Sequence, residues 1–158
     1  MDDIGDQPPE IVIRWVKELR RTVDYLEQRP DIDSRRMAYY GMYIGATHAP
    51  IVLAVEPRIK AGFIESGALD KDLPAPPPEV DPFNFLPRVR TPFMIMNSHY
   101  SSTYPYATSQ MPMLEYLGTP EEHKRLLSGE YRDPVPFTDI FPVVPPWLDE
   151  YLGSVEGF

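Results

Sequence analysis

The sequence predicts a single α/β domain in which a mostly parallel sheet is flanked by helices. Helical and strand-like segments follow one another in the order helix, strand, helix, strand, strand, helix, and this alternation is typical of parallel sheets. A chain of 158 residues is long enough to bury one core. Its 20 prolines, well above the average share, indicate that much of the chain forms loops.

The first expected element is an amphipathic helix that begins after Pro8 and Pro9. Apolar residues recur there at helical spacing, with charged residues between them: Ile11, Val12, Trp15, Val16, Leu19, Val23 and Leu26. Arg29 and Pro30 end this helix, because proline removes a backbone donor and disrupts a helix interior.

Three apolar segments are expected to form strands: Met37 to Met42, Ile59 to Glu65 and Thr91 to Asn97. Gly41 and Gly45 allow a sharp turn after the first strand, since glycine adopts backbone conformations that other residues avoid. A helix rich in Ala, Val, Ile and Leu then runs to Val55.

Proline shapes the second half of the chain. The proline-rich segment 68–90 is expected to be an extended insertion rather than a helix. A helix over about residues 106–117 follows, with Gly118 as its C′ residue, and Thr119 starts one short further turn. The last helix can be intact only from about Pro145 onward.

Composition limits the possible partners. With 24 acidic and 15 basic residues the net charge is −9, which repels phosphate backbones and anionic lipids, so neither nucleic acid nor membrane is an expected partner. Cysteine is absent, which removes disulfides and thiolate chemistry. Without a membrane-spanning run or a signal peptide, a cytoplasmic location is expected. The chain divides into an acidic leader, one domain and a tail: 1–9, 10–153 and 154–158.

The segment Gly41-Met42-Tyr43-Ile44-Gly45 lies between a predicted strand and a predicted helix, where a G-x-S-x-G nucleophile elbow would stand. Further segments match in the same order: 19–26, 29–33, 53–61, 82–85, 108–110 and 147–153. Over about residues 15–153, the chain resembles the C-terminal part of α/β-hydrolases of the dipeptidyl-peptidase, acylaminoacyl-peptidase and dienelactone-hydrolase kind. The resemblance implies a truncated hydrolase-like sheet.

The same resemblance implies that the catalytic triad has been replaced. Tyr43 stands where the family has the nucleophilic serine, and a phenol with a pKa near 10 is a poor substitute. Ser101 stands where the family has the acid, and Asp133 stands where it has the histidine. Because a triad acts as a unit, we predict a chain that is inactive as a hydrolase.

The predicted function is binding in the former active-site crevice. The resemblance places several Tyr and His side chains on loops above the carboxyl ends of the strands, where open α/β sheets bind ligands. The candidate ligand-binding residues are Tyr43, Ile44, His48, His99, Tyr100, Tyr104 and Tyr131, with Tyr106 beside them. Either an engineered variant or a specialised non-catalytic homologue fits this pattern. The competing interpretation is a dead site filled by its own side chains.

A divalent metal such as zinc is the second predicted ligand. Imidazole and carboxylate groups suit zinc, and the candidate ligands are His48, His99 and Asp133, with Tyr43 or Glu130 in reserve. No motif sets their spacing. His123 lies in a charged turn and is expected at the surface.

Two alternatives remain. A reshuffled serine hydrolase would use Ser101 or Ser102 as nucleophile, His99 or His48 as base and Asp133 as the orienting acid. A self-associating module would instead use the strand at Met37 to Met42. That strand is central in the resembled family but would be an edge here, so we expect a homodimer formed edge to edge.

Overall fold

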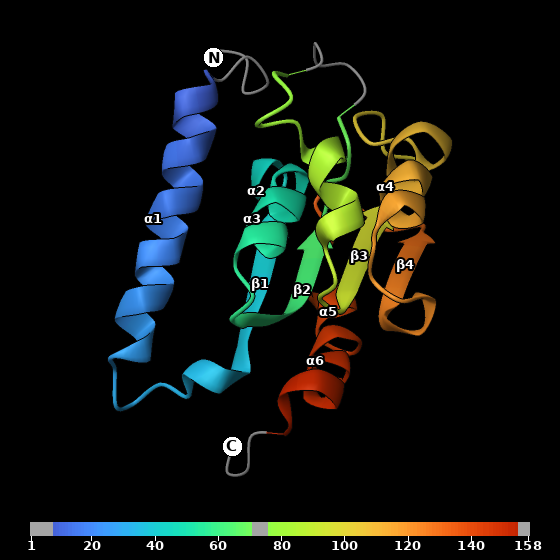
Figure 1. Cartoon of the computed structure of the whole chain (residues 1–158). Helices are drawn as coiled ribbons and strands as arrows, with labels where there is room; N and C mark the ends of the chain where they lie inside the picture. The colour runs from blue at the N-terminus through green and yellow to red at the C-terminus, as the bar shows by residue number, and fades with distance from the viewer. Residues whose placement is uncertain (1–7, 71–75, 155–158) are drawn as a thin grey trace.

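The computed structural model describes residues 8–70 and 76–154 (Figure 1). One sheet holds four strands, which are β1 (Met37–Met42), β2 (Ile59–Glu65), β3 (Phe93–Ser98) and β4 (Lys124–Gly129), in the spatial order β1-β2-β3-β4. All three neighbouring pairs are parallel, which confirms the predicted fold class. Most of the leader, part of the proline-rich insertion and most of the tail lie outside the described residues.

Helices cover both faces of the sheet (Figure 1). One face carries α1 (Pro9–Glu27), α2 (Ile44–Thr47), α3 (Ala49–Val55) and α4 (Met111–Tyr116), and the other carries α5 (Phe137–Ile140) and α6 (Val144–Leu152). Alternate residues of β3 supply the two cores. Phe93 and Ile95 pack with the first group, while Met94 and Met96 pack with Trp147 of α6. A strand buried on both faces explains the continuous apolar run in the sequence.

Short turns connect these elements. Three are 3-10 helices, η2 (Ser34–Arg36), η3 (Pro82–Arg88) and η5 (Glu121–His123), and the π-helix η4 (Tyr106–Gln110) leads into α4. The insertion therefore has more regular structure than expected. Gly118 directly follows Leu117, the C-cap of α4, and is its C′ residue as predicted. Its φ is not positive, since Gly153 is the one glycine of positive φ in the described chain. A Cβ at Gly118 would lie 2.3 Å from the Pro87 carbonyl oxygen, so close packing requires glycine there.

Strand β4 was not expected from the sequence. Its first residues, Lys124 and Arg125, are charged, and the two leucines that follow are adjacent. The segment therefore lacks the alternation of apolar and polar residues that indicates a strand. It pairs with β3 over six residue pairs, from Phe93 with Lys124 to Ser98 with Gly129. The sheet therefore extends one strand beyond the prediction.

Strand β1 forms one edge of the described sheet, as predicted, because it pairs with β2 alone. Two of its apolar side chains are exposed to a large extent, Tyr40 by 52% and Met42 by 42%. The Tyr40 ring stacks on Phe63 of β2, with ring centroids 5.5 Å apart.

A buried carboxylate ties α1 to the start of β2. The Glu56 side chain, 1% exposed, accepts hydrogen bonds from Arg58 Nε at 2.6 Å and from a second guanidinium nitrogen at 2.5 Å. The same guanidinium reaches Asp24 at 2.7 Å and Glu27 at 2.6 Å on α1. Hydrogen bonding to Arg58 lowers the pKa of the Glu56 carboxyl below its usual value.

Candidate functional site

The turn after β1 has the strained geometry of an elbow. Tyr43 has φ 49° and ψ −114°, and among the described non-glycine residues only Ser66 shares a positive φ. Such conformations cost about 1 to 3 kcal/mol and persist only where the surroundings impose them. A Cβ at Gly41 would lie 2.6 Å from the Gly45 carbonyl oxygen, and one at Gly67 would lie 2.4 Å from the Ala46 Cβ. The glycines therefore permit the sharp turn that the sequence predicted.

Three loops bring Tyr43, Ser101 and Asp133 together at the carboxyl ends of β1, β3 and β4. We refer to these three residues as the carboxyl-edge cluster. Ser101 Oγ donates a hydrogen bond to Asp133 Oδ2 at 3.0 Å and accepts one from the Tyr104 backbone N–H at 3.2 Å. Partial burial raises the pKa of the Tyr43 phenol, and the nearby Asp133 and Glu65 carboxylates raise it further.

Glu65 and Ser66, at the end of β2, belong to the same neighbourhood and were missed by the sequence analysis. The Glu65 carboxylate, 1% exposed, accepts hydrogen bonds from the Tyr40 hydroxyl at 3.0 Å, from the Ser66 hydroxyl and from the Val135 backbone N–H at 3.1 Å. Ser66 Oγ also accepts from Val135 N–H at 2.9 Å. These bonds hold the loop that carries Asp133. The available signal was a carboxylate that ends an apolar strand.

The other predicted ligand-binding residues are spread over several places. Tyr104 is only 6% exposed and packs in the core, with its hydroxyl 3.4 Å from Thr47 Oγ1. Tyr131 is half-buried against the core beneath α6, while Tyr100 is 74% exposed. Ile44 lines an apolar cavity beneath α1 rather than the carboxyl edge. The predicted set therefore does not form one pocket.

His48 lies beneath α1, away from the carboxyl-edge cluster. Its Nδ1 is 3.0 Å from the Ile44 carbonyl oxygen, and its ring meets Trp15 edge-on with centroids 6.0 Å apart. Both side chains line the cavity that Ile44 also lines. Burial lowers the pKa of the His48 imidazole, which favours the neutral ring.

His99 lies at the opposite edge of the sheet, near the end of β4. Its Nδ1 is 3.2 Å from Ser128 Oγ, and its ring packs on Tyr106 with centroids 4.6 Å apart. His123, expected at the surface, is instead half-buried, with its Nδ1 3.2 Å from the Tyr151 hydroxyl of α6.

The structure does not support the predicted metal site at His48, His99 and Asp133. The two histidines have different neighbours near opposite edges of the sheet, and Asp133 contacts Ser101. Within the described ranges, no group of three or more His, Cys, Asp or Glu side chains is arranged to hold a metal ion.

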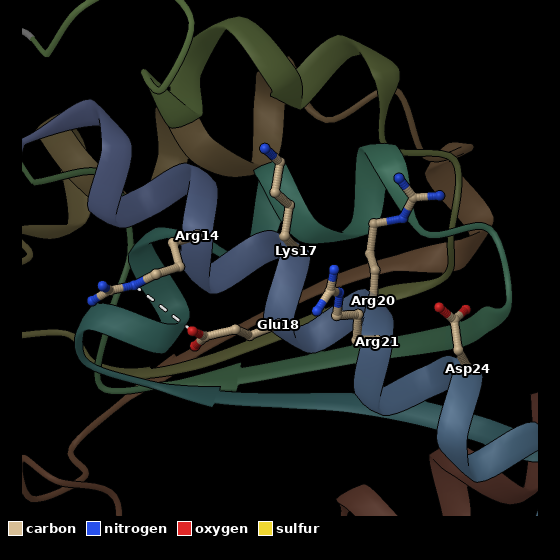
Figure 2. A pocket seen from close by; sticks show the side chains of 6 residues that line it. All are labelled: Arg14, Lys17, Glu18, Arg20, Arg21 and Asp24. Atoms are coloured by element: carbon tan, nitrogen blue, oxygen red, sulfur yellow. Dashed lines mark ion pairs between the residues drawn. The ribbon is translucent and has the colours of Figure 1, made fainter.

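Charged side chains form a surface along α1. Figure 2 shows Arg14, Lys17, Glu18, Arg20, Arg21 and Asp24, all from this one helix. The drawn ion pair joins Arg14 to Glu18 at 3.7 Å, and both side chains are 64% exposed. Such pairs contribute little, and one exposed helix face does not enclose a ligand. This surface is therefore a solvated face of α1.

No family model and no curated protein matches this sequence. Solved structures do match. A zinc-bound cold-adapted esterase from an Arctic intertidal metagenomic library superimposes with a TM-score of 0.69 at 18% identity, over 89% of this chain and 59% of the esterase. The fold is that of the α/β-hydrolases.

Two further structures agree. The esterase domain of a Rhodothermus marinus protein has a TM-score of 0.68 at 15% identity, over 87% of this chain and 69% of that domain. The 2,6-dihydroxy-pseudo-oxynicotine hydrolase has a TM-score of 0.69 at 20% identity, over 87% of this chain and 46% of the hydrolase. The chain thus spans 59% of the first esterase and superimposes on part of its fold. No helix of the described ranges has the length and apolar character of a membrane span.

Proposed function

We propose that this chain is a non-catalytic protein of the α/β-hydrolase fold that binds a small molecule through its carboxyl-edge cluster. The observation that carries the proposal is the direct hydrogen bond of 3.0 Å between Ser101 Oγ and Asp133 Oδ2. In a hydrolase triad the acid holds the imidazole that activates the nucleophile. Here Ser101 and Asp133, which the resemblance assigns to the acid and histidine positions, contact each other, and neither of them is an imidazole.

The chemistry of Tyr43 also supports a binding role. A phenol attacks a carbonyl only as phenolate or with a general base at its oxygen. The pKa of Tyr43 is raised by burial and by the neighbouring carboxylates, so the hydroxyl stays protonated at neutral pH. Its neighbour is the weakly basic Asp133. Tyr43 is therefore suited to donate a hydrogen bond to a ligand.

The reshuffled serine hydrolase lacks a base at its serine. The matching esterases and hydrolase favour this alternative, since their fold supports ester chemistry. Ser101 donates to Asp133, however, and His99 pairs with Ser128. In the described ranges, neither Ser101 nor Ser102 has a hydrogen bond to an imidazole. A serine without a general base is a weak nucleophile.

The exposed groups indicate the ligand class. Asp133 is exposed and accepts hydrogen bonds, and Tyr43, 39% exposed, places a hydroxyl beside it. The net charge of −9 attracts cations and repels anions. A ligand that carries several hydrogen-bond donors, such as a polyol or an amine, suits this surface.

The first test is to restore the triad. The unchanged chain should hydrolyse an activated aryl acetate at the uncatalysed rate, and a fluorophosphonate should not label it. The triple change Tyr43→Ser, Ser101→Asp and Asp133→His should raise the rate above background, because it returns nucleophile, acid and base to touching positions. The matched control replaces Ser101→Asp with Ser102→Asp and should remain inactive.

Two results of this test would contradict the proposal or the assignment behind it. Turnover by the unchanged chain that Ser101→Ala abolishes would support the reshuffled hydrolase and end the binding proposal. An inactive triple variant with an intact circular-dichroism spectrum would contradict the assignment of these residues to triad positions.

The second test is ligand binding itself. Polyols and amines are screened by thermal shift, and a ligand at a hundred times its Kd adds about 2.7 kcal/mol of stability. Asp133→Asn should weaken the binding of a ligand at this site. Asp31→Asn, a change at an exposed ion pair elsewhere, should leave that binding unchanged. If neither class shifts the melting temperature, the site is filled by its own side chains.

Self-association along β1 is a second candidate function. Its support is the unpaired edge of the described sheet, with Tyr40 and Met42 exposed on it. Such an edge is a template for pairing, and a twofold axis lets two copies of β1 pair antiparallel. Sedimentation should find a dimer that Met42→Lys dissociates and that Phe137→Lys, a change at an exposed residue of α5, leaves intact. A monomer at all micromolar concentrations would refute it.

A further inference from the structure

We propose that a groove beside His99 binds a small planar aromatic molecule, neutral or singly negative. This His99 groove has a volume of about 360 Å³ and lies between the end of β4 and the helical segment 106–116. Its lining residues are His99, Tyr106, Met111, Leu114, Leu126 and Ser128. The volume is within the range of small-molecule sites. The proposal is independent of the carboxyl-edge cluster.

The rim of the His99 groove offers aromatic surface. The His99 and Tyr106 rings lie 4.6 Å apart between centroids with an angle of 35°, and Tyr100 meets His99 edge-on at 5.2 Å. Aromatic rings attract one another at centroid distances of 4.5 to 7 Å. Both Tyr100 and His99 are exposed, so a planar ligand would cover ring surface that now faces water.

Hydrogen bonding orients the imidazole toward a ligand. Ser128 Oγ is 3.2 Å from His99 Nδ1 and therefore fixes the plane of the ring. Within the described ranges, neither His99 Nε2 nor the Tyr106 hydroxyl has a hydrogen-bond partner. The rim thus presents two free polar groups, and Met111, Leu114 and Leu126 supply an apolar wall. A planar ring with one or two polar substituents can hydrogen-bond to the two polar groups and pack on the apolar wall.

The ligand proposed for the His99 groove differs in charge from the one proposed for the carboxyl-edge cluster. Among the residues that the structure describes, no carboxylate lines the His99 groove, whereas Asp133 is part of the cluster. A carboxylate or phenol substituent on the ligand can therefore accept a hydrogen bond from the imidazole without repulsion from a lining side chain. The matching probes are 4-hydroxybenzoate and its neutral methyl ester.

The test uses NMR of the full chain with labelled His rings and Met methyl groups. Titration with 4-hydroxybenzoate should shift the His99 and Met111 signals in a saturable way, and the His123 signal should not move. His123 is the internal control, because it also packs on a tyrosine, Tyr151, but outside the groove. Cyclohexanecarboxylate should bind more weakly, because it carries the charge without the planar ring.

Substitutions test whether the probe binds in the His99 groove. Tyr106→Leu should weaken binding by about three- to tenfold, since one aromatic contact is lost, while Tyr106→Phe should retain the stacking. Asp133→Asn should leave the affinity unchanged, which separates this site from the carboxyl-edge cluster. The proposal is overturned if no probe moves the His99 signal, if Tyr106→Leu binds as tightly as the unchanged chain, or if cyclohexanecarboxylate binds equally well.

Discussion

The buried carboxylate of Glu56 allows a quantitative test of how α1 is held. Arg58→Ala removes the guanidinium that donates to Glu56 at 2.6 and 2.5 Å and that also reaches Asp24 and Glu27 of α1. Glu56 would then keep Arg20 Nε at 3.4 Å as its charged neighbour, and the Arg20 side chain is 52% exposed. The variant therefore leaves a buried charge poorly compensated.

Breaking a buried ion pair by removing one partner costs about 3 to 5 kcal/mol. Arg58 is 27% exposed and Arg20 remains, so we expect a loss near the lower end, about 3 kcal/mol. For a chain of this size that corresponds to a fall in melting temperature of roughly 6 to 12 °C. The matched control is Arg35→Ala: Arg35 contacts Asp33 with two nitrogens at 3.0 and 3.1 Å but is 87% exposed, and should cost under about 1 kcal/mol.

Urea unfolding followed by tryptophan fluorescence measures both variants. Trp15 lies on α1 and Trp147 lies on α6, so variants that keep a single tryptophan report on the two faces separately. The pKa of Glu56 is lowered in the folded state, so its contribution is present above about pH 4 and is lost as the pH falls through the folded pKa. The Arg58→Ala penalty should therefore shrink in acid. If Arg58→Ala costs no more than Arg35→Ala at neutral pH, the reasoning is refuted.

Three further predictions concern packing and ionisation. Gly41→Ala should cost about 1 to 3 kcal/mol, because its Cβ would lie 2.6 Å from the Gly45 carbonyl oxygen, whereas Gly45→Ala, with its nearest neighbour at 3.6 Å, should be tolerated; urea midpoints compare them. Burial raises the pKa of Tyr39 and Tyr40 to about 12, so spectrophotometric titration should find these two phenols ionising near pH 12, and the stability they contribute should be lost as the pH rises from about 10 to about 12. Gln110→Leu should cost about 2 kcal/mol in thermal unfolding, because the buried amide donates two hydrogen bonds of 2.8 Å to backbone carbonyls.

The elements that could be predicted are those whose own residues carry a clear apolar pattern. Strands β2 and β3 are mostly apolar, and α1 carries its apolar residues at helical spacing, so each pattern indicates its own structure. Strand β4 begins with Lys124 and Arg125 and is half-buried at the sheet edge. Its pairing with β3 comes from the tertiary fold, and no local pattern revealed it.

The candidate site divides in the same way. Ser101 and Asp133 follow two neighbouring parallel strands, β3 and β4, and the structure places their side chains in contact. Because β4 was not predicted, only the resemblance to the α/β-hydrolases assigned these two residues to one site. Glu65 was not recognised as part of the site, because one of its hydrogen-bond donors is the backbone N–H of Val135, 70 residues away in the sequence. The directions of His48 and His99 depend on contacts with Trp15 and Tyr106 that spacing does not encode.

The strand order β1-β2-β3-β4 repeats the order of the strands along the chain. During synthesis on a ribosome, each strand that emerges can therefore pair with a strand that is already present, and no strand has to insert between two others. Unpaired strand edges that are exposed during folding are prone to aggregate, so early pairing would shorten the time that apolar strands are exposed to other chains. The growing side of the sheet remains open until Lys124–Gly129 arrives, so a ribosome that stalls before this segment would present β3, apolar on both faces, as an unpaired edge.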